Sequence, residues 1–180
     1  MELKLKHTLA IEPKGYSHSY GSHWSVTNTI TITGENITYL NCIDRGWLHL
    51  NVSKFPALRE LHCYGNHLTN LDLSKNTALT ILYCHYNQLT KLDVSKNTAL
   101  TDLSCIGNQL TSLDVSKNTA LKDLLCINNQ LSASALDALF GTLHSNTILD
   151  KIILVNGNPG ADACNPSIAT KKGWKVVTHL

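Results

Sequence analysis

A 21-residue repeat constrains the fold of this chain more than any other feature of its sequence. Three copies follow one another without a gap, beginning at Leu68, Leu89 and Leu110, and the middle copy reads LTKLDVSKNTALTDLSCIGNQ. A more divergent copy occupies residues 47–67, and half of another covers residues 37–45. Tandem units of this length stack so that neighbouring copies share one continuous core. The period therefore predicts a solenoid.

Each repeat divides into two similar halves, LTKLDVSKNTA and LTDLSCIGNQ in the middle copy. Apolar residues alternate within each half, as Leu92 and Val94 do in the first and Leu103 and Cys105 in the second. Alternation is typical of a strand with one buried face. We therefore expect two strands per coil, on opposite sides of a flattened spiral. Equivalent strands of successive coils should pair in parallel, about 4.8 Å apart.

Five of the six cysteines follow the same period: Cys42, Cys63, Cys84, Cys105 and Cys126. No CxxC pair and no zinc-type spacing of cysteine and histidine accompanies them. We interpret this column as small apolar side chains packed in the core, not as disulfides or metal ligands. Cys164 stands outside the register and lacks a neighbouring base, so it is also predicted to pack.

Asparagine recurs in two further columns, Asn66, Asn87, Asn108 and Asn129 in one and Asn76, Asn97 and Asn118 in the other. Asparagine tolerates tight turns, and its side chain bonds backbone groups that a turn leaves unpaired. Both columns are predicted to be structural.

The phrase LxxLxCxxNxL, read from Leu79 to Leu89, resembles the leucine-rich repeat with cysteine in place of one leucine. The period of 21 and the second phrase LxxLDVSKN resemble the nested bacterial subclass called IRREKO, which is common in surface proteins of gut Bacteroidetes. The tail from Gly157 to Trp174 resembles the closing segment of that group. The resemblance covers residues 37–177. It implies a mainly β leucine-rich-repeat solenoid of about six coils, with an internalin-like binding or adhesion role at a bacterial surface.

The repeat ends after Gln130, and we expect the flanking segments to close the core at both ends of a single domain. Residues 37–131 are the repeats. Residues 132–180 should form a C-terminal cap with helices at 132–144 and 166–172, a strand that buries Ile153 and Val155, and a last strand at 174–177. Ser132 and Asn165 are the predicted helix caps, and Asn158 should continue the first asparagine column. Residues 1–36, which alternate in ELKLKH and TITIT, should form N-terminal cap strands.

Alternation also predicts which side chains point outward on the cysteine-bearing sheet. Equivalent outward positions there vary and include tyrosine, histidine and isoleucine, whereas the opposite side repeats Asp and Ser-Lys. Varied apolar and aromatic surface often marks an interface. Drift at unimportant positions is the alternative explanation. The predicted partner-binding face consists of Glu60, His62, Tyr64, Ile81, Tyr83, His85, Tyr86, Asp102, Ser104, Ile106, Leu125 and Ile127.

Composition and motifs narrow the functional classes. The chain carries 15 Lys and Arg among 13 Asp and Glu, so a nucleic-acid partner is not expected. Neither a membrane-spanning run nor a signal peptide is predicted. A phosphate loop, GxSxG and HExxH are all missing from the sequence, so we expect no enzyme activity, no cofactor and no metal.

The resulting prediction is a monomeric binding module, extracellular or at the bacterial surface by family resemblance, with a protein as its partner. A glycan is the alternative partner, because tyrosine rings stack on sugars. A passive spacer within a larger surface protein is the second alternative.

Overall fold

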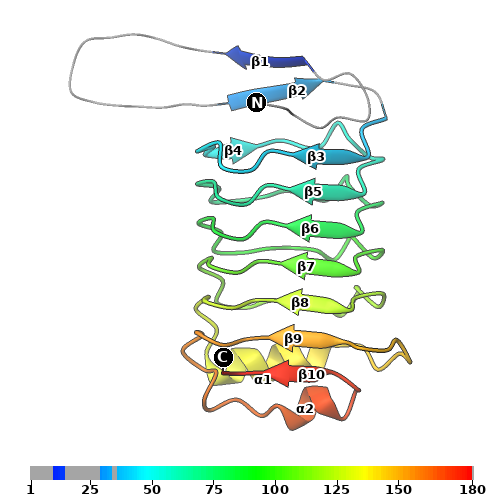
Figure 1. Ribbon diagram of the computed structural model, residues 1–180, viewed down its shortest axis with the longest axis vertical. Coiled ribbons are helices and arrows are strands. Elements are labelled where there is room, and N and C mark those ends of the chain that lie inside the picture. The colour runs from blue at the N-terminus through cyan, green and yellow to red at the C-terminus, as the bar shows by residue number, and fades with distance from the viewer. Residues whose placement is uncertain (1–9, 15–28, 34–35, 180) are drawn as a thin grey trace, which may run out of the picture.

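The computed structural model describes residues 10–14, 29–33 and 36–179, and their coils stack along one long axis (Figure 1). One sheet of seven parallel strands runs along the stack, in the order β10-β9-β8-β7-β6-β5-β3. Each strand is short: β3 (Tyr39–Asn41), β5 (Glu60–His62), β6 (Ile81–Tyr83), β7 (Asp102–Ser104), β8 (Asp123–Leu125), β9 (Ile152–Leu154) and β10 (Lys175–Val177). Leu61 pairs with Leu82, and Leu82 with Leu103. Residues one repeat apart therefore stack directly, as the period predicts.

A second sheet lies at the N-terminal end of the stack (Figure 1). It has three strands: β1 (Ala10–Lys14), β2 (Thr29–Thr33) and β4 (His49–Leu50). β2 pairs antiparallel with β1 and parallel with β4. The expected strand over TITIT is β2, whereas the alternating segment 2–7 lies outside the described residues.

Leucine and cysteine side chains fill the interior between the two sides of each coil. All five periodic cysteines are fully buried members of the core, as predicted. The backbone N–H of Cys63 donates to the Tyr83 carbonyl at 2.8 Å, and the N–H of Cys84 donates to the Ser104 carbonyl at 2.9 Å. The parallel hydrogen-bond ladder thus continues past each three-residue strand and includes the cysteine.

The prediction of a second strand in every coil is wrong. Opposite the seven-stranded sheet, the described repeats make successive turns, and we call this the turn side of the solenoid. Asp72 Oδ1 accepts the Ser74 N–H at 2.9 Å, and the Asn76 N–H donates to the Leu73 carbonyl at 3.0 Å. These local bonds take the backbone out of an extended conformation. Leu71 and Leu73 are still buried. The alternating pattern therefore predicted correctly which side chains are buried, but it predicted strand pairing that does not form there.

Asparagine side chains join the coils on both sides. Asn87 Oδ1 accepts the Leu68 N–H at 3.0 Å, while its Nδ2 donates to the carbonyls of Cys63 and Cys84, each at 3.0 Å. Asn158 continues this column, as predicted, by accepting the Leu131 N–H. On the turn side, Asn76 Nδ2 donates to two carbonyls of the preceding coil at 2.9 Å each. Both columns are therefore structural, as expected.

Helix α1 (Ala133–Thr142) closes the C-terminal end (Figure 1). Ser132 caps it as predicted, because its hydroxyl accepts the Ala135 N–H at 3.2 Å. Leu136, Leu139 and Phe140 are buried against the last coils. The Lys172 ammonium donates to the Phe140 and Leu143 carbonyls, at 3.2 and 2.8 Å, and so binds the exposed end of the helix.

The second helix is shorter than the predicted 166–172 segment, since α2 spans only Ser167–Thr170. The N-cap of α2 is Pro166 and not the predicted Asn165, whose side chain accepts the Ser167 N–H at 3.2 Å and so closes the turn that enters the helix. Trp174, expected to begin the last strand, precedes β10 instead. It is buried, and its indole N–H donates to the His144 carbonyl at 2.9 Å. Ile153 and Val155 are buried as predicted.

Candidate partner-binding face

The outward surface of the seven-stranded sheet, called the sheet face below, consists of three columns of side chains. The first column comes from the first residue of each strand and the middle column from the last. The third column follows the buried cysteine of each coil. Ten of the twelve predicted residues lie in these columns and are partly exposed. The other two are Ser104, which is buried, and Tyr86, which lies on the turn beyond the third column.

The N-terminal half of the sheet face carries a connected cluster of six rings: Tyr39, His62, Tyr64, Tyr83, His85 and Tyr86. Tyr64 and His85 stack with their centroids 4.0 Å apart and their planes 14° apart. His62 and Tyr83 lie 4.8 Å apart, and the edge of Tyr39 meets His62 at 5.2 Å. Stacked coils therefore hold the rings in fixed positions, with little side-chain freedom left to lose on binding.

Tyr39 was missing from the predicted face. It stands 21 residues before Glu60 and pairs with it in the sheet. Extending the period into the half repeat at residues 37–45 would have found it.

Burial lowers the pKa of both histidines in this cluster. For His62 the nearby Glu60 carboxylate, 4.0 Å from Nε2, opposes that effect. For His85 the nearby His62 adds to the lowering, and Asp44 opposes it. The Ser104 hydroxyl lies 3.3 Å from His85 Nδ1. In the middle column Ser104 lies between two larger residues, Tyr83 and Leu125. These neighbours and the His85 contact explain why the small Ser104 side chain is buried and not exposed as predicted.

The C-terminal half of the sheet face combines a carboxylate pair with aliphatic side chains. Asp102 and Asp123 stand on adjacent strands in the first column. Burial raises the pKa of Asp123, and a hydrogen bond that protonated Asp123 donates to Asp102, together with the Asp102 charge, raises it further. Ile106, Leu125 and Ile127 lie beside this pair and are partly exposed. The face is thus aromatic at one end and aliphatic with acidic groups at the other.

Comparison with known proteins agrees with this geometry. A family model described as leucine-rich repeats in two copies matches residues 56–97. The functional domain of InlJ from Listeria monocytogenes, whose structure includes a cysteine ladder, superimposes with a TM-score of 0.62 at 28% identity, over 78% of this chain and 30% of that chain. This chain has the leucine-rich-repeat solenoid fold.

Two further structures share the solenoid fold. The leucine-rich-repeat protein LIC12759 from Leptospira interrogans has a TM-score of 0.52 at 20% identity, over 72% of this chain and 40% of that one. The internalin InlF from L. monocytogenes has a TM-score of 0.53 at 18% identity, over 78% of this chain and 46% of that one. The chain spans less than half of each structure. No curated protein matches its sequence.

The described part of the solenoid holds no cluster of three or more His, Cys, Asp or Glu side chains suited to a metal ion. Its thiols are also poor nucleophiles, because burial raises the pKa of Cys42 and of Cys105 to about 12 and raises that of the less buried Cys164. None of the described helices is both long and apolar enough to cross a membrane.

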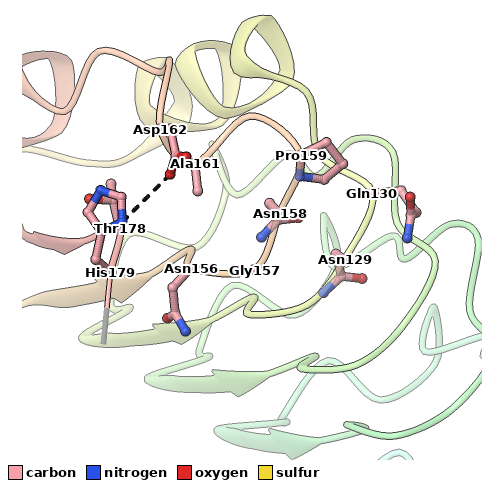
Figure 2. A pocket seen from close by; sticks show the side chains of 10 residues that line it. All are labelled: Asn129, Gln130, Asn156, Gly157, Asn158, Pro159, Ala161, Asp162, Thr178 and His179. Atoms are coloured by element: carbon pink, nitrogen blue, oxygen red, sulfur yellow. Dashed lines mark ion pairs between the residues drawn. The ribbon is translucent and has the colours of Figure 1, made fainter.

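A shallow recess of about 550 Å³ lies at the C-terminal end of the solenoid. Figure 2 shows the residues that line it. Some of its polar groups are engaged, although the buried Asn156 side-chain oxygen has no hydrogen-bond partner. His179 forms an ion pair with Asp162 at 3.6 Å, and the Asn129 and Asn158 amides bond the backbone of neighbouring coils. The recess therefore follows from how the last coils end, and the sheet face is the stronger candidate site.

Proposed function

We propose that this leucine-rich-repeat solenoid is a binding module that docks a protein partner on its sheet face. Leucine-rich-repeat domains generally serve as protein-interaction modules, and the chain resembles internalins in fold. The proposal uses the predicted residues other than the buried Ser104, together with Tyr39, and it assigns the chain no enzymatic activity.

The observation that carries the proposal is the contrast between the two sides of the coils. On the turn side the outward carboxylates close turns, with Ser N–H to Asp Oδ1 distances of 2.9, 2.8 and 2.7 Å for Asp72, Asp93 and Asp114. On the sheet face the backbone is already paired by neighbouring strands. Its outward side chains are therefore free to serve binding, and rings and aliphatic groups gather there.

A protein partner suits these rings better than a glycan does. Sugars stack on the flat faces of aromatic rings. Here Tyr64 and His85 each give one ring face to the other, and the neighbouring rings also contact one another. The cluster mainly offers ring edges, hydroxyls and ring nitrogens, which suit the polar and apolar groups of a polypeptide.

The proposal places the module, as a monomer, at a bacterial surface or outside the cell, in an adhesion role. The 21-residue, IRREKO-like repeat and the resemblance to internalins support this placement. A passive spacer remains the competing function, and it requires that substitutions on the two sides of the solenoid be equally tolerated.

A double substitution tests the face. Peptides enriched on the intact chain from a displayed random-peptide library serve as probes. We expect the Tyr64→Ala/Tyr83→Ala variant to bind them at least about thirtyfold more weakly, the loss typical of hot-spot residues. The unfolding free energy should fall by only about 1 kcal/mol per lost ring contact. Calorimetry or surface plasmon resonance gives the affinities, and urea titration gives the stability.

The matched control is Asp93→Ala/Lys96→Ala on the turn side, which should bind the probes as the parent chain does. Equal losses for the two variants, or no enriched peptide at all, would contradict the proposal and favour a spacer. Binding on a glycan array that the tyrosine variant abolishes would assign the same face to a sugar partner.

A further inference from the structure

The turn that leaves the third column has a left-handed backbone in every coil from β3 to β9. The φ values at the six equivalent positions lie between 52° and 72°. We call these positions the turn column: Asp44, Gly65, Tyr86, Gly107, Asn128 and Gly157. The N–H of each of the first five donates to a carbonyl in the next coil, as Tyr86 N–H does to Ile106 at 2.7 Å. This conformation therefore belongs to the coil and does not depend on the residue that occupies it.

Tyrosine is out of place in this column. Glycine adopts the left-handed region freely, and Asn and Asp are the other residues that enter it routinely. Among the described residues, the non-glycine side chains with positive φ are Asn or Asp in every case except Tyr86, whose φ is 52°. Asn128 fills the same turn two coils further on. The fold therefore does not require a tyrosine at this position.

Glycine and larger residues alternate along the turn column, and each larger side chain lies over the next glycine. A Cβ atom added at Gly107 would lie 2.7 Å from Tyr86 Cδ1. The Asp44 side chain lies over Gly65 in the same way, and the Asn128 side chain over Gly157. The ring edge of Tyr86 also meets His85 at 5.4 Å. The Tyr86 ring is therefore fixed by Gly107 and His85.

Although it is fixed, Tyr86 is 60% exposed, and only one other large apolar side chain of the described residues, Leu149, is classed as exposed. Beyond His85 of its own coil, the third column continues with the aliphatic Ile106 in the next coil and Ile127 in the one after. A rigid exposed ring beside aliphatic groups fits an apolar side chain of a partner. A residue kept in a disfavoured conformation with its ring in solvent indicates function, because it does not stabilise the fold.

We infer that Tyr86 is the anchor residue of the sheet face, where its ring, supported by Gly107 and His85, receives an apolar side chain of a protein partner. This inference rests on the proposed function. It adds that the anchor lowers the stability of the fold: binding favours tyrosine at position 86, whereas the left-handed backbone favours asparagine or glycine.

Tyr86→Asn separates these demands, since asparagine is the residue already found at position 128. The unfolding equilibrium constant should stay the same or fall by up to about tenfold, because asparagine accepts a left-handed backbone. Affinity for peptides enriched on the parent chain should fall by about thirtyfold. Urea titration and surface plasmon resonance measure the two effects. Asn128→Gly is the matched control, and its affinity should equal that of the parent chain.

Gly107→Ala tests how the ring is supported. The added methyl group displaces the Tyr86 ring and also strains the left-handed backbone at position 107, so stability should fall in both backgrounds. Affinity should fall in the parent chain but show little further fall in Tyr86→Asn. Peptides that are lost on Tyr64→Ala/Tyr83→Ala but retained on Tyr86→Asn would overturn this inference and leave the proposed function standing. A Tyr86→Asn variant that loses stability would also overturn it, because the tyrosine would then be structural. Failure to enrich any peptide overturns both proposals.

Discussion

The two sides of each coil bury similar leucines but use their outward side chains differently. On the turn side Asp72, Asp93 and Asp114 each accept the N–H of a serine two residues later. Each of these side chains therefore satisfies a backbone N–H of its own turn. On the sheet side the neighbouring strand satisfies the backbone, and equivalent positions hold residues as different as His62, Tyr83 and Leu125. Sequence monotony in a repeat thus marks side chains needed by the backbone, and variation marks side chains that are not.

The turn column shows both behaviours at one place. Its backbone conformation is constant, yet its side chains alternate between glycine and larger residues. The larger side chain needs the glycine of the next coil as its support, so the repeating unit there is effectively two coils long. A period of 21 residues in the sequence therefore conceals a second period in the packing.

The largest expected effect comes from removing a side chain of the asparagine column that joins neighbouring coils. Asn87→Ala leaves the buried Leu68 N–H without its partner, whereas the Cys63 and Cys84 carbonyls keep Asn66 and Asn108 as donors. The unfolding free energy should fall by about 1–3 kcal/mol, the cost of one unsatisfied buried group. Urea unfolding monitored by circular dichroism measures this loss. Asn70→Ala, at an exposed position of the same repeat, is the control. A loss no larger than that of the control would mean that the column does not hold the coils together.

A smaller effect is expected on the turn side. Asp93→Ala removes the hydrogen bond to Ser95, and because Asp93 is exposed the loss at pH 7 should be at most about 1 kcal/mol. Hydrogen bonds from Ser95 lower the pKa of Asp93. This stabilisation is therefore present above the unfolded pKa, about 3.9, and is lost as the pH falls through the lower folded value. Urea titrations at several pH values should show parent and variant converging in acid. A difference that persists in acid would assign the effect to packing.

The smallest effect concerns the histidines of the sheet face. Burial lowers the folded pKa of His62 and His85, so below about pH 6.5 the unfolded chain takes up protons before the folded chain does. Stability should fall as the pH drops from 6.5 through the folded pKa values. Replacing both residues with glutamine should flatten this slope, by less than about 1 kcal/mol because both rings are partly solvated. Unfolding titrations at intervals between pH 5 and pH 7.5 measure the slope. The Asn70→Ala control, which removes no titratable group, should leave it unchanged, and an equal change there would contradict the assignment.

The period and the alternation in the sequence by themselves determined how the coils stack and which side chains point inward or outward. They placed Leu61, Leu82 and Leu103 in one inward column and Cys63, Cys84 and Cys105 in another, because residues one repeat apart must stack and strand side chains must alternate. The cap at Ser132 was also readable, because capping is a local property.

Tertiary structure decided what depends on neighbours from other coils. The Leu71 and Leu73 segment alternates like a strand yet belongs to no sheet, and it leads into turns that the Asp72 side chain and Asn76 help to close. Ser104 points outward yet is buried, because exposure depends on the size of adjacent side chains. The seat of Tyr86 on Gly107 is visible only once the coils are stacked, since local sequence encodes conformation and direction, whereas contact between side chains is a property of the assembled solenoid.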